Sequence, residues 1–380
     1  MKQALVLYGA TDLGASEFSA DILWATGFKV PDPILFVQIE GRKILFASPL
    51  EVERAQKEAR VDEVLLLSAL RGEEHQDHPL ITYLRQQGVT QVTIADSLRY
   101  SLAVLFSKHF ELSAIPAPFG AERSIKRPDE LQEVTKAQRA LERAVAKGVQ
   151  ILRESEIRGD ELWHTLYDHA LTSDGIRIAI DSDLYAQGYL GVDSIVACGV
   201  HAADPHCQGQ GPLRPYEPIV LDIFPRSLTT LYFADQTRTV FKGEPSAMLK
   251  KMYAAVLEAQ EKAISMIKAG MQSQDVMRAA NDTLEERGFP TSLTERPVYG
   301  FIHGLGHGVG LEIHEAPRIG RSGEILQEGM VVTVEPGLYY SRQHGDIPVA
   351  GIRIEDMVVV TKEGCINLTQ FSKKLEDMIV

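Results

Sequence analysis

The stretch Ile-Val-Leu-Asp-Ile-Phe at 219–224 is followed by Tyr-Phe-Ala-Asp-Gln-Thr-Arg-Thr at 232–239. Each segment is rich in apolar and β-branched residues and predicts a β-strand, yet each carries one aspartate, Asp222 and Asp235. Turn-forming residues at 225–230 indicate that the two strands form a hairpin. Because side chains on adjacent strands of a hairpin can face one pocket, we expect Asp222 and Asp235 to converge.

Three more ionisable side chains interrupt apolar or glycine-rich segments. His307 lies inside the glycine-rich stretch 304–310, Glu335 ends the apolar stretch 331–334, and Glu355 follows 351–354. A buried carboxylate is strongly destabilising unless it is neutralised, paired or bound to a metal. The four carboxylates carry a formal charge that two divalent cations would balance. Oxygen donors with one imidazole suit Mn²⁺, Co²⁺ or Zn²⁺.

The order and the flanking residues of these five positions resemble a known family. The likeness rests on Asp222, Asp235-Gln-Thr-Arg-Thr, Gly306-His-Gly-Val-Gly with His314-Glu315 seven residues after His307, Val334-Glu-Pro-Gly, and Gly351-Ile-Arg-Ile-Glu. This string is similar to the metallopeptidases that include methionine aminopeptidase, aminopeptidase P, prolidase and creatinase. The likeness covers about residue 124 to the C-terminus, and the preceding residues resemble the creatinase-type N-terminal domain.

The resemblance implies an α+β fold of the pita-bread type and a site for two divalent metal ions, with manganese expected and cobalt or zinc as alternatives. Asp222 would bind one ion through both oxygens, and Asp235 and Glu355 would bridge the two ions. His307 and Glu335 would complete the other ion's ligands. The ions would activate a water molecule, and Glu335 would take its proton and pass it to the leaving nitrogen.

Four further residues have a place in the resemblance. His206 and His314 match histidines that contact substrate and the tetrahedral intermediate in the proline-directed members. His303 matches another active-site histidine of aminopeptidase P, and Arg353 fits the same branch. His201 competes with His206, but His206 stands at the family's interval before the first aspartate.

The segment after Asp222 departs from the family pattern. Common members have Asp-X-Gly followed by an acid and a tyrosine, whereas this chain continues Ile223-Phe-Pro-Arg and has a hairpin longer by about two residues. We therefore expect the wall of the site on the substrate side to differ here.

Two domains are predicted, a smaller mixed α/β creatinase-type N-terminal domain at 1–122 and a catalytic domain at 123–380. In the first domain we expect strands at 4–8, 34–37, 43–46, 63–67 and 92–95, helices at 79–87 and 97–107, and a hairpin at 34–46. In the second we expect helices at 128–154, 160–172, 245–269 and 273–288, and strands at 176–180, 194–198, 219–224, 330–335 and 351–360. The repeated order of two helices and then strands predicts a pseudo-symmetric domain.

Composition restricts the partners. The net charge of −13 argues against nucleic acid and anionic membranes, because both bind through clustered Lys and Arg. No segment approaches the roughly eighteen apolar residues of a membrane helix, and three cysteines without metal-finger spacing indicate a reducing compartment. We expect a cytoplasmic homodimer, since the N-terminal domain of such proteins commonly supplies a partner surface.

Other functions fit the sequence less well. The stretch 304–310 does not match G-x-G-x-x-G, and 303–307 does not match H-E-x-x-H. A metal-free hydrolase resembling creatinase, or a non-catalytic binding protein on the same fold, would have lost ligands that this chain keeps. We expect hydrolysis of the bond before a proline at the second position of a small peptide, as an Xaa-Pro aminopeptidase. The alternative is an Xaa-Pro dipeptidase, also called prolidase.

Overall fold

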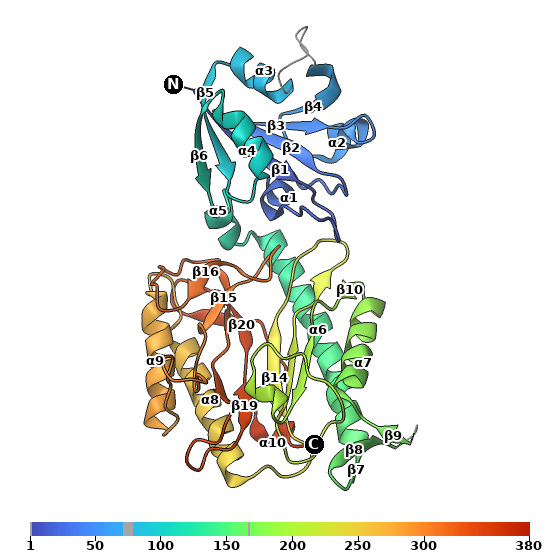
Figure 1. The fold of residues 1–380 in the computed structure, drawn as a ribbon, viewed down its shortest axis with the longest axis vertical. Coiled ribbons are helices and arrows are strands. Elements are labelled where there is room, and N and C mark those ends of the chain that lie inside the picture. The colour runs from blue at the N-terminus through green and yellow to red at the C-terminus, as the bar shows by residue number, and fades with distance from the viewer. Residues whose placement is uncertain (1, 71–78, 166–167) are drawn as a thin grey trace. The chain divides into compact units, whose positions relative to one another are not determined.

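The computed structural model describes residues 2–70, 79–165 and 168–380. The chain divides into two compact units, Met1–Arg123 and Ser124–Val380. Figure 1 follows the chain through both units from the N-terminus to the C-terminus. None of the helices in the described ranges combines the length and the hydropathy that crossing a membrane requires.

The first unit is built on a six-stranded sheet of order β4-β3-β2-β1-β5-β6. Its strands are β1 (Lys2–Gly9), β2 (Ile34–Ile39), β3 (Arg42–Ala47), β4 (Glu63–Leu66), β5 (Val89–Ala95) and β6 (Glu111–Ile115). Its helices are α1 (Ala20–Thr26), α2 (Val52–Glu58), the 3₁₀ helix η1 (Leu67–Leu70), α3 (Pro79–Gln86), α4 (Tyr100–Ser107) and α5 (Gly120–Ser124). Strand β2 runs antiparallel to β1 and β3, which confirms the predicted hairpin.

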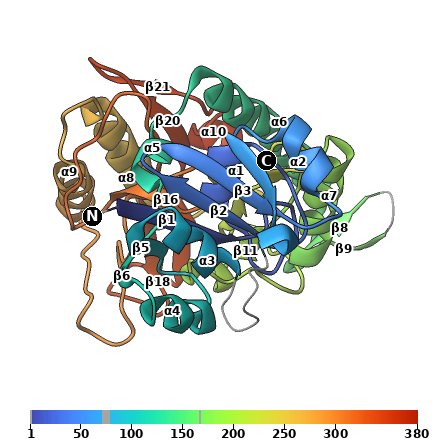
Figure 2. The ribbon, with the colours of Figure 1, turned by 90° about the horizontal axis from the view of Figure 1, so that it is seen from above.

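Alternation along β1 gives this sheet two apolar faces. Val6 packs in a cluster with Leu80 of α3 and Phe106 of α4. Its neighbour Leu7 packs in a second cluster with Ile22 of α1 and Ala55 of α2. The sheet therefore carries helices on both faces, and Figure 2 shows β1, β2 and β3 side by side.

The second unit contains five α-helices within its described residues: α6 (Pro128–Glu154), α7 (Ser173–Ala186), α8 (Ala247–Met266), α9 (Ser273–Glu286) and α10 (Leu375–Met378). Its shorter strands are β7 (Glu156–Arg158), β8 (Glu161–His164), β9 (His169–Ala170), β10 (Tyr189–Leu190), β13 (Arg226–Ser227) and β21 (Cys365–Asn367). The strands around the site are β11 (Ile195–Cys198), β12 (Ile219–Ile223), β14 (Gln236–Val240), β15 (Gly306–Gly308), β16 (Glu315–Ile319), β17 (Val331–Val334), β18 (Gly337–Tyr340), β19 (Ala350–Arg353) and β20 (Asp356–Val360).

These elements form two halves around one hydrophobic core. In the first half, α6 and α7 pack beside the sheet β11-β12-β14. In the second, α8 and α9 pack beside the sheet β16-β15-β17-β20-β21. Figure 1 shows the two helix pairs on opposite sides of the strands. One continuous cluster of buried side chains joins the halves, and the predicted fold class is confirmed.

Two predicted elements near residue 170 are wrong. The helix expected at 160–172 is instead strands β8 and β9, and the strand expected at 176–180 is part of helix α7. The isoleucines in this segment alternate as in a strand, but Ile176, Ile180 and Leu184 are spaced four residues apart, about one helical turn, and form the buried face of a helix. Thr172 caps this helix through a hydrogen bond from the Gly175 N–H.

The strand expected at 351–360 is interrupted. Strand β19 pairs with β18, whereas β20 pairs with β17 in a different sheet. Ile354 and Glu355 form the crossing between them. Glu355 therefore lies where the two sheets meet.

Candidate metal centre

A cavity of about 410 Å³ in the second unit brings together all nine site residues predicted from the sequence. They are His206, Asp222, Asp235, His303, His307, His314, Glu335, Arg353 and Glu355. Elements from both halves contribute, because β12 and β14 belong to the first half and β15, β17 and β19 follow α8 and α9.

The β12–β14 hairpin places the two aspartates. Asp222 is paired in register with Thr237, and Asp235 directly precedes β14. The Thr237 hydroxyl lies 2.9 Å from Asp222 Oδ1 and 2.8 Å from Glu355 Oε2. Since a hydroxyl has one proton, it donates to one carboxylate at a time. The Glu355 N–H also donates to the Thr237 carbonyl oxygen at 3.1 Å, so Thr237 ties Glu355 to the hairpin.

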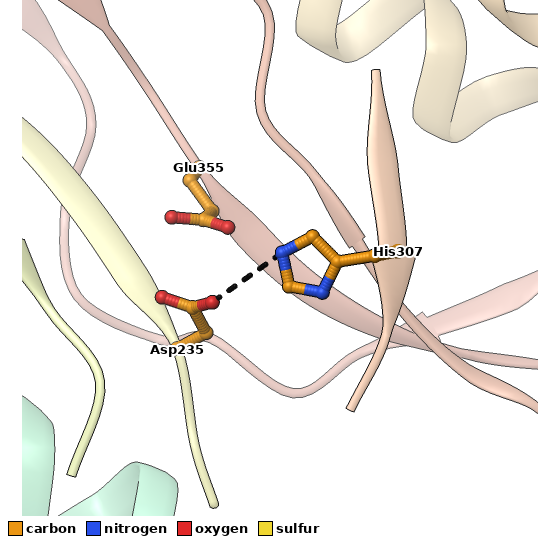
Figure 3. A group of neighbouring side chains, drawn as sticks. All are labelled: Asp235, His307 and Glu355. Carbon is orange, nitrogen blue, oxygen red and sulfur yellow. Dashed lines mark ion pairs between the residues drawn. The ribbon is translucent and has the colours of Figure 1, made fainter. Parts of the chain in front are cut away.

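Strand β15 places the imidazole. A Cβ at Gly306 would lie 2.0 Å from the Thr333 carbonyl oxygen, so only glycine permits this close approach of β15 to β17. The His307 N–H donates to Thr333 Oγ1 at 3.1 Å. Its ring atom Nε2 lies 3.3 Å from Glu335 Oε1 and 3.7 Å from Asp235 Oδ2. Figure 3 shows Asp235, His307 and Glu355 pointing toward one another.

The charge within this cluster is unbalanced. Burial, and then the neighbouring carboxylates, raise the pKa of Asp235 and of Glu355 well above the ordinary values. Burial opposes ionisation of Glu335 as well, but the hydrogen bond and charge of His307 lower the pKa of Glu335 to about 2. Within the described residues, Asp235 Oδ1 is buried without a hydrogen-bond partner.

These features fit a divalent cation. One ligand atom from each of Asp235, His307 and Glu355 lies within 4.8 Å of the others. A cation bound there would neutralise the repelling carboxylates and would give the unpartnered oxygen of Asp235 a ligand. The donor set of carboxylate oxygens and one imidazole matches the preference of first-row divalent metals.

Arg353 holds one edge of the cluster. Its side chain is 4% exposed and forms an ion pair with Asp222. It also donates from Nη1 to the Tyr339 hydroxyl at 2.7 Å and from Nε to Thr237 Oγ1 at 3.0 Å. The Tyr339 oxygen lies 3.0 Å from His303 Nε2. One chain of contacts therefore runs from Asp222 through Arg353 and Tyr339 to His303.

The other histidines occupy different positions. The His314 ring centroid lies 4.3 Å from that of His307, and burial, then His307 and Arg318, lower the pKa of His314 to about 4. Burial also lowers the pKa of His303. Both imidazoles are therefore neutral near pH 7. His206 lines this cavity, whereas His201 lines a separate one.

Sequence reasoning did not single out four residues of the cavity and its surroundings. Both Thr237 and Tyr339 are neutral. Thr237 lies inside Asp235-Gln-Thr-Arg-Thr, which was quoted for its aspartate, and Tyr339 lies two residues after Val334-Glu-Pro-Gly. Phe224 and Arg318 line the cavity as well. The signal for all four was their separation by two or four residues from a predicted ligand or histidine, on strands where alternate residues share a face.

Buried acids and an imidazole that converge from two halves of one α+β unit fit a divalent-metal centre such as metal-dependent hydrolases use. Residues 132–362 match the model of metallopeptidase family M24, which spans more than half of the chain. The chain belongs to this family and is a metallopeptidase. The predicted family and enzyme class are confirmed.

Similar proteins include peptidases with known structures. An uncharacterized peptidase of Staphylococcus aureus is 29% identical over 346 residues, 89% of this chain and 88% of the relative. The Xaa-Pro dipeptidase from Bacillus anthracis is 25% identical with a TM-score of 0.81, covering 100% of this chain and 95% of that chain. A prolidase from Pyrococcus furiosus and an X-Pro aminopeptidase from Thermotoga maritima are each 26% identical with a TM-score of 0.76, covering 97% of this chain and 96% of theirs.

Proposed function

We propose that this protein is a two-metal exopeptidase that hydrolyses the bond between the first residue and a proline at the second position of a small peptide. The buried cluster of Asp235, His307 and Glu355 carries this proposal. The similarity to both Xaa-Pro dipeptidases and an X-Pro aminopeptidase supports the substrate class.

In this proposal the ligands of the two ions are Asp222, Asp235, His307, Glu335 and Glu355. Their four carboxylates carry the charge that two divalent ions balance, and manganese is the expected metal, with cobalt or zinc as alternatives. The bound ions would lower the pKa of a water molecule and polarise the scissile carbonyl.

The remaining chemistry falls to side chains of the cavity. Glu335, which is ionised near pH 7, accepts the proton of the attacking water and delivers it to the leaving proline nitrogen. His314 and His206 donate hydrogen bonds to the oxyanion, each commonly worth about 3 kcal/mol. Arg353 positions Asp222, and His303 binds the substrate from the Tyr339 side.

A proline substrate places a particular demand on this site. The Xaa-Pro bond has no amide N–H, so the site needs no acceptor for one. The leaving nitrogen must still be protonated before it departs, and Glu335 supplies that proton.

The test is hydrolysis of Leu-Pro and of Leu-Pro-Ala by chelated protein to which Mn²⁺ is added back. We expect hydrolysis of at least one of these two peptides and much slower hydrolysis of Leu-Ala. Full activity after complete metal removal, or equal activity on Leu-Ala, would contradict the proposal.

One observation favours the second candidate, an Xaa-Pro dipeptidase. Arg318 lines the cavity beside His314, and within the described residues its guanidinium makes no hydrogen bond or ion pair. In a dipeptide the proline carries a free carboxylate, which is the natural partner of a guanidinium. Arg318→Met should then raise KM for Leu-Pro about 10-fold or more and affect Leu-Pro-Ala less. An equal effect on both peptides would count against the dipeptidase.

The homodimer and the cytoplasmic location stay predictions. Light scattering of the purified protein measures its mass directly, and twice the chain mass of 42.1 kDa is the value expected for the dimer.

A further inference from the structure

Phe224 lines the same cavity as the cluster of Asp235, His307 and Glu355. Residues 219–223 form β12, in which Asp222 faces the site and alternate residues share a face. Phe224 is two residues further along and lines the same cavity. The last paired position of the hairpin is Ile223 with Gln236, so Phe224 and Asp235 come next on the two strands.

The ring of Phe224 does not serve the core. It is only partly buried, and it belongs neither to the main hydrophobic core of the second unit nor to the small cluster around Ile195 and Val220. No contact with another aromatic ring involves it within the described residues. A large apolar side chain that lines a cavity without joining the core indicates contact with a ligand.

The backbone around Phe224 is held in place. The Ala234 N–H donates to the Pro225 carbonyl oxygen at 3.1 Å, and the Phe233 N–H donates to the Gly310 carbonyl oxygen at 2.8 Å. The Arg226 guanidinium lies over the Phe233 ring, 5.1 Å from its centroid. These contacts hold the backbone on either side of the turn next to Phe224.

The neighbours of Phe224 indicate which part of a substrate it meets. Glu335, the proposed proton donor to the leaving proline nitrogen, directly follows β17 in the second half, whereas Phe224 directly follows β12 in the first half. In a substrate whose leaving nitrogen lies at Glu335, the first residue would lie on the other side of the scissile carbonyl, and our proposal places it against β12. Ile195 is paired in register with Asp222 and lines the cavity too, which makes this wall apolar.

We propose that Phe224, together with Ile195, forms the pocket for the side chain of the residue that precedes the proline and selects apolar side chains there. This inference rests on the proposed Xaa-Pro hydrolysis and assigns its specificity to a position that departs from the Asp-X-Gly pattern. Burying an apolar side chain against a protein wall is worth roughly 10- to 200-fold in selectivity.

The test compares kcat/KM for Leu-Pro and Gly-Pro, or for Leu-Pro-Ala and Gly-Pro-Ala if the enzyme prefers longer peptides. Glycine has no side chain to meet the ring, so the Leu-to-Gly ratio isolates the contact. We expect Phe224→Ala to lower this ratio about 10-fold. Phe224→Leu, which keeps an apolar side chain, should hold the ratio within about 3-fold of the wild-type value.

Two outcomes would overturn the inference alone, provided that the variant is folded and active. An equal change on both peptides would place the ring against the proline, and a ratio that stays constant or rises would show that it makes no favourable contact with the first residue. Tyr185→Ala, an exposed aromatic on α7, is the matched control and should leave the ratio unchanged. Wild-type protein inactive on every Xaa-Pro peptide would instead overturn the proposed function.

Discussion

Among the residues of the cluster, Asp235 gives the strongest evidence for a bound metal ion. Its side chain is buried among carboxylates, its pKa is raised well above the ordinary value by burial and then by Glu355, and its Oδ1 atom has no partner within the described residues. A cation relieves all three conditions. Without one, ionised Asp235 opposes folding near neutral pH.

The variant Asp235→Asn distinguishes the effect of this carboxylate on metal binding from its effect on the stability of the metal-free protein. The variant should lose metal and at least about 100-fold in activity, more than the loss of an outer hydrogen-bond partner costs. Because it removes a buried charge, the metal-free variant should unfold about 2–4 °C above metal-free wild type at pH 7.5. Calorimetry of both proteins after chelation checks this, and a lower transition temperature in the variant would count against a strained metal-free site.

We expect Thr237 to strengthen metal binding without contacting the substrate. Its hydroxyl contacts Asp222, Glu355 and Arg353. Thr237→Val removes these hydrogen bonds and should weaken Mn²⁺ binding about 10- to 100-fold. Thr237→Ser keeps the hydroxyl and should bind nearly as wild type does. Titration with Mn²⁺ followed by calorimetry distinguishes them, and equal affinities of the two variants would exclude this role for the hydroxyl.

At the residue scale, all nine ionisable side chains selected from the sequence line one cavity, and their roles stay predictions. A carboxylate inside an apolar strand is a strong signal because burying it requires a compensating partner. Thr237 and Tyr339 carry no charge, so only their spacing from Asp235 and Glu335 distinguished them from core residues. Their importance depends on three-dimensional contacts with Arg353.

Among the elements, strand β14 connects the site to the C-terminal segment through Arg238. This arginine is fully buried and pairs with Asp356 at 2.8 Å. It also donates to the carbonyl oxygens of Glu355, Phe371 and Ser372. The residues after β21 are thereby attached to the strands that carry the carboxylates.

Arg238→Met should lower the free energy of unfolding by about 3–5 kcal/mol, because it breaks a buried ion pair and leaves several carbonyl groups unpaired. Arg278→Met removes an exposed pair with Asp275 on α9 and should change stability by less than about 0.5 kcal/mol. Urea unfolding of the metal-loaded proteins measures both. Equal decreases in the free energy of unfolding of the two variants would contradict the larger stabilisation expected from the buried pair.

Long helices were predicted closely, whereas the region around residue 170 was not. Helix α6 begins at Pro128, where proline fits a first turn. Helix α7 was taken for a strand because Ile176, Ile178 and Ile180 alternate, but Ile178 is 64% exposed. The alternation therefore reflects no buried face. The Thr172 cap and the burial at every fourth residue decide the helix.

Over the whole molecule, metal binding should couple stability to pH. Asp235 and Glu355 have raised pKa values, so their ionisation destabilises the metal-free fold increasingly as pH rises toward neutrality. His314 has the opposite effect, because its pKa is lowered to about 4. Its contribution to folding stability is fully present above about pH 6.5 and is lost as the pH falls toward 4.

The increase in transition temperature on adding Mn²⁺ is the difference between protein with and without the metal, measured at one pH. Because His314 affects the stability of both forms, most of its effect cancels in this difference. This increase should be larger at pH 7.5 than at pH 5.5, where protons compete with the metal for Asp235 and Glu355. Calorimetry at the two pH values, with and without Mn²⁺, provides the comparison. An increase that is equal or larger at pH 5.5 would contradict the assignment of these two carboxylates.

The two-half organisation was visible in the repeated order of helices and strands, because that order depends on local patterns. The choice between dipeptide and longer substrates was not, because in our proposal it rests on how Arg318, which lines the folded cavity, meets the substrate. Folding brings residues as far apart as Asp222 and Glu355 within reach of the single hydroxyl of Thr237.

Metal content measured together with activity tests the two-metal site most directly. Chelated protein titrated with Mn²⁺ should recover hydrolysis of an Xaa-Pro peptide as bound metal rises to two ions per chain, with Asp235→Asn failing to recover it. Undiminished hydrolysis by protein that contains less than about 0.1 metal ion per chain would contradict a metal-dependent mechanism.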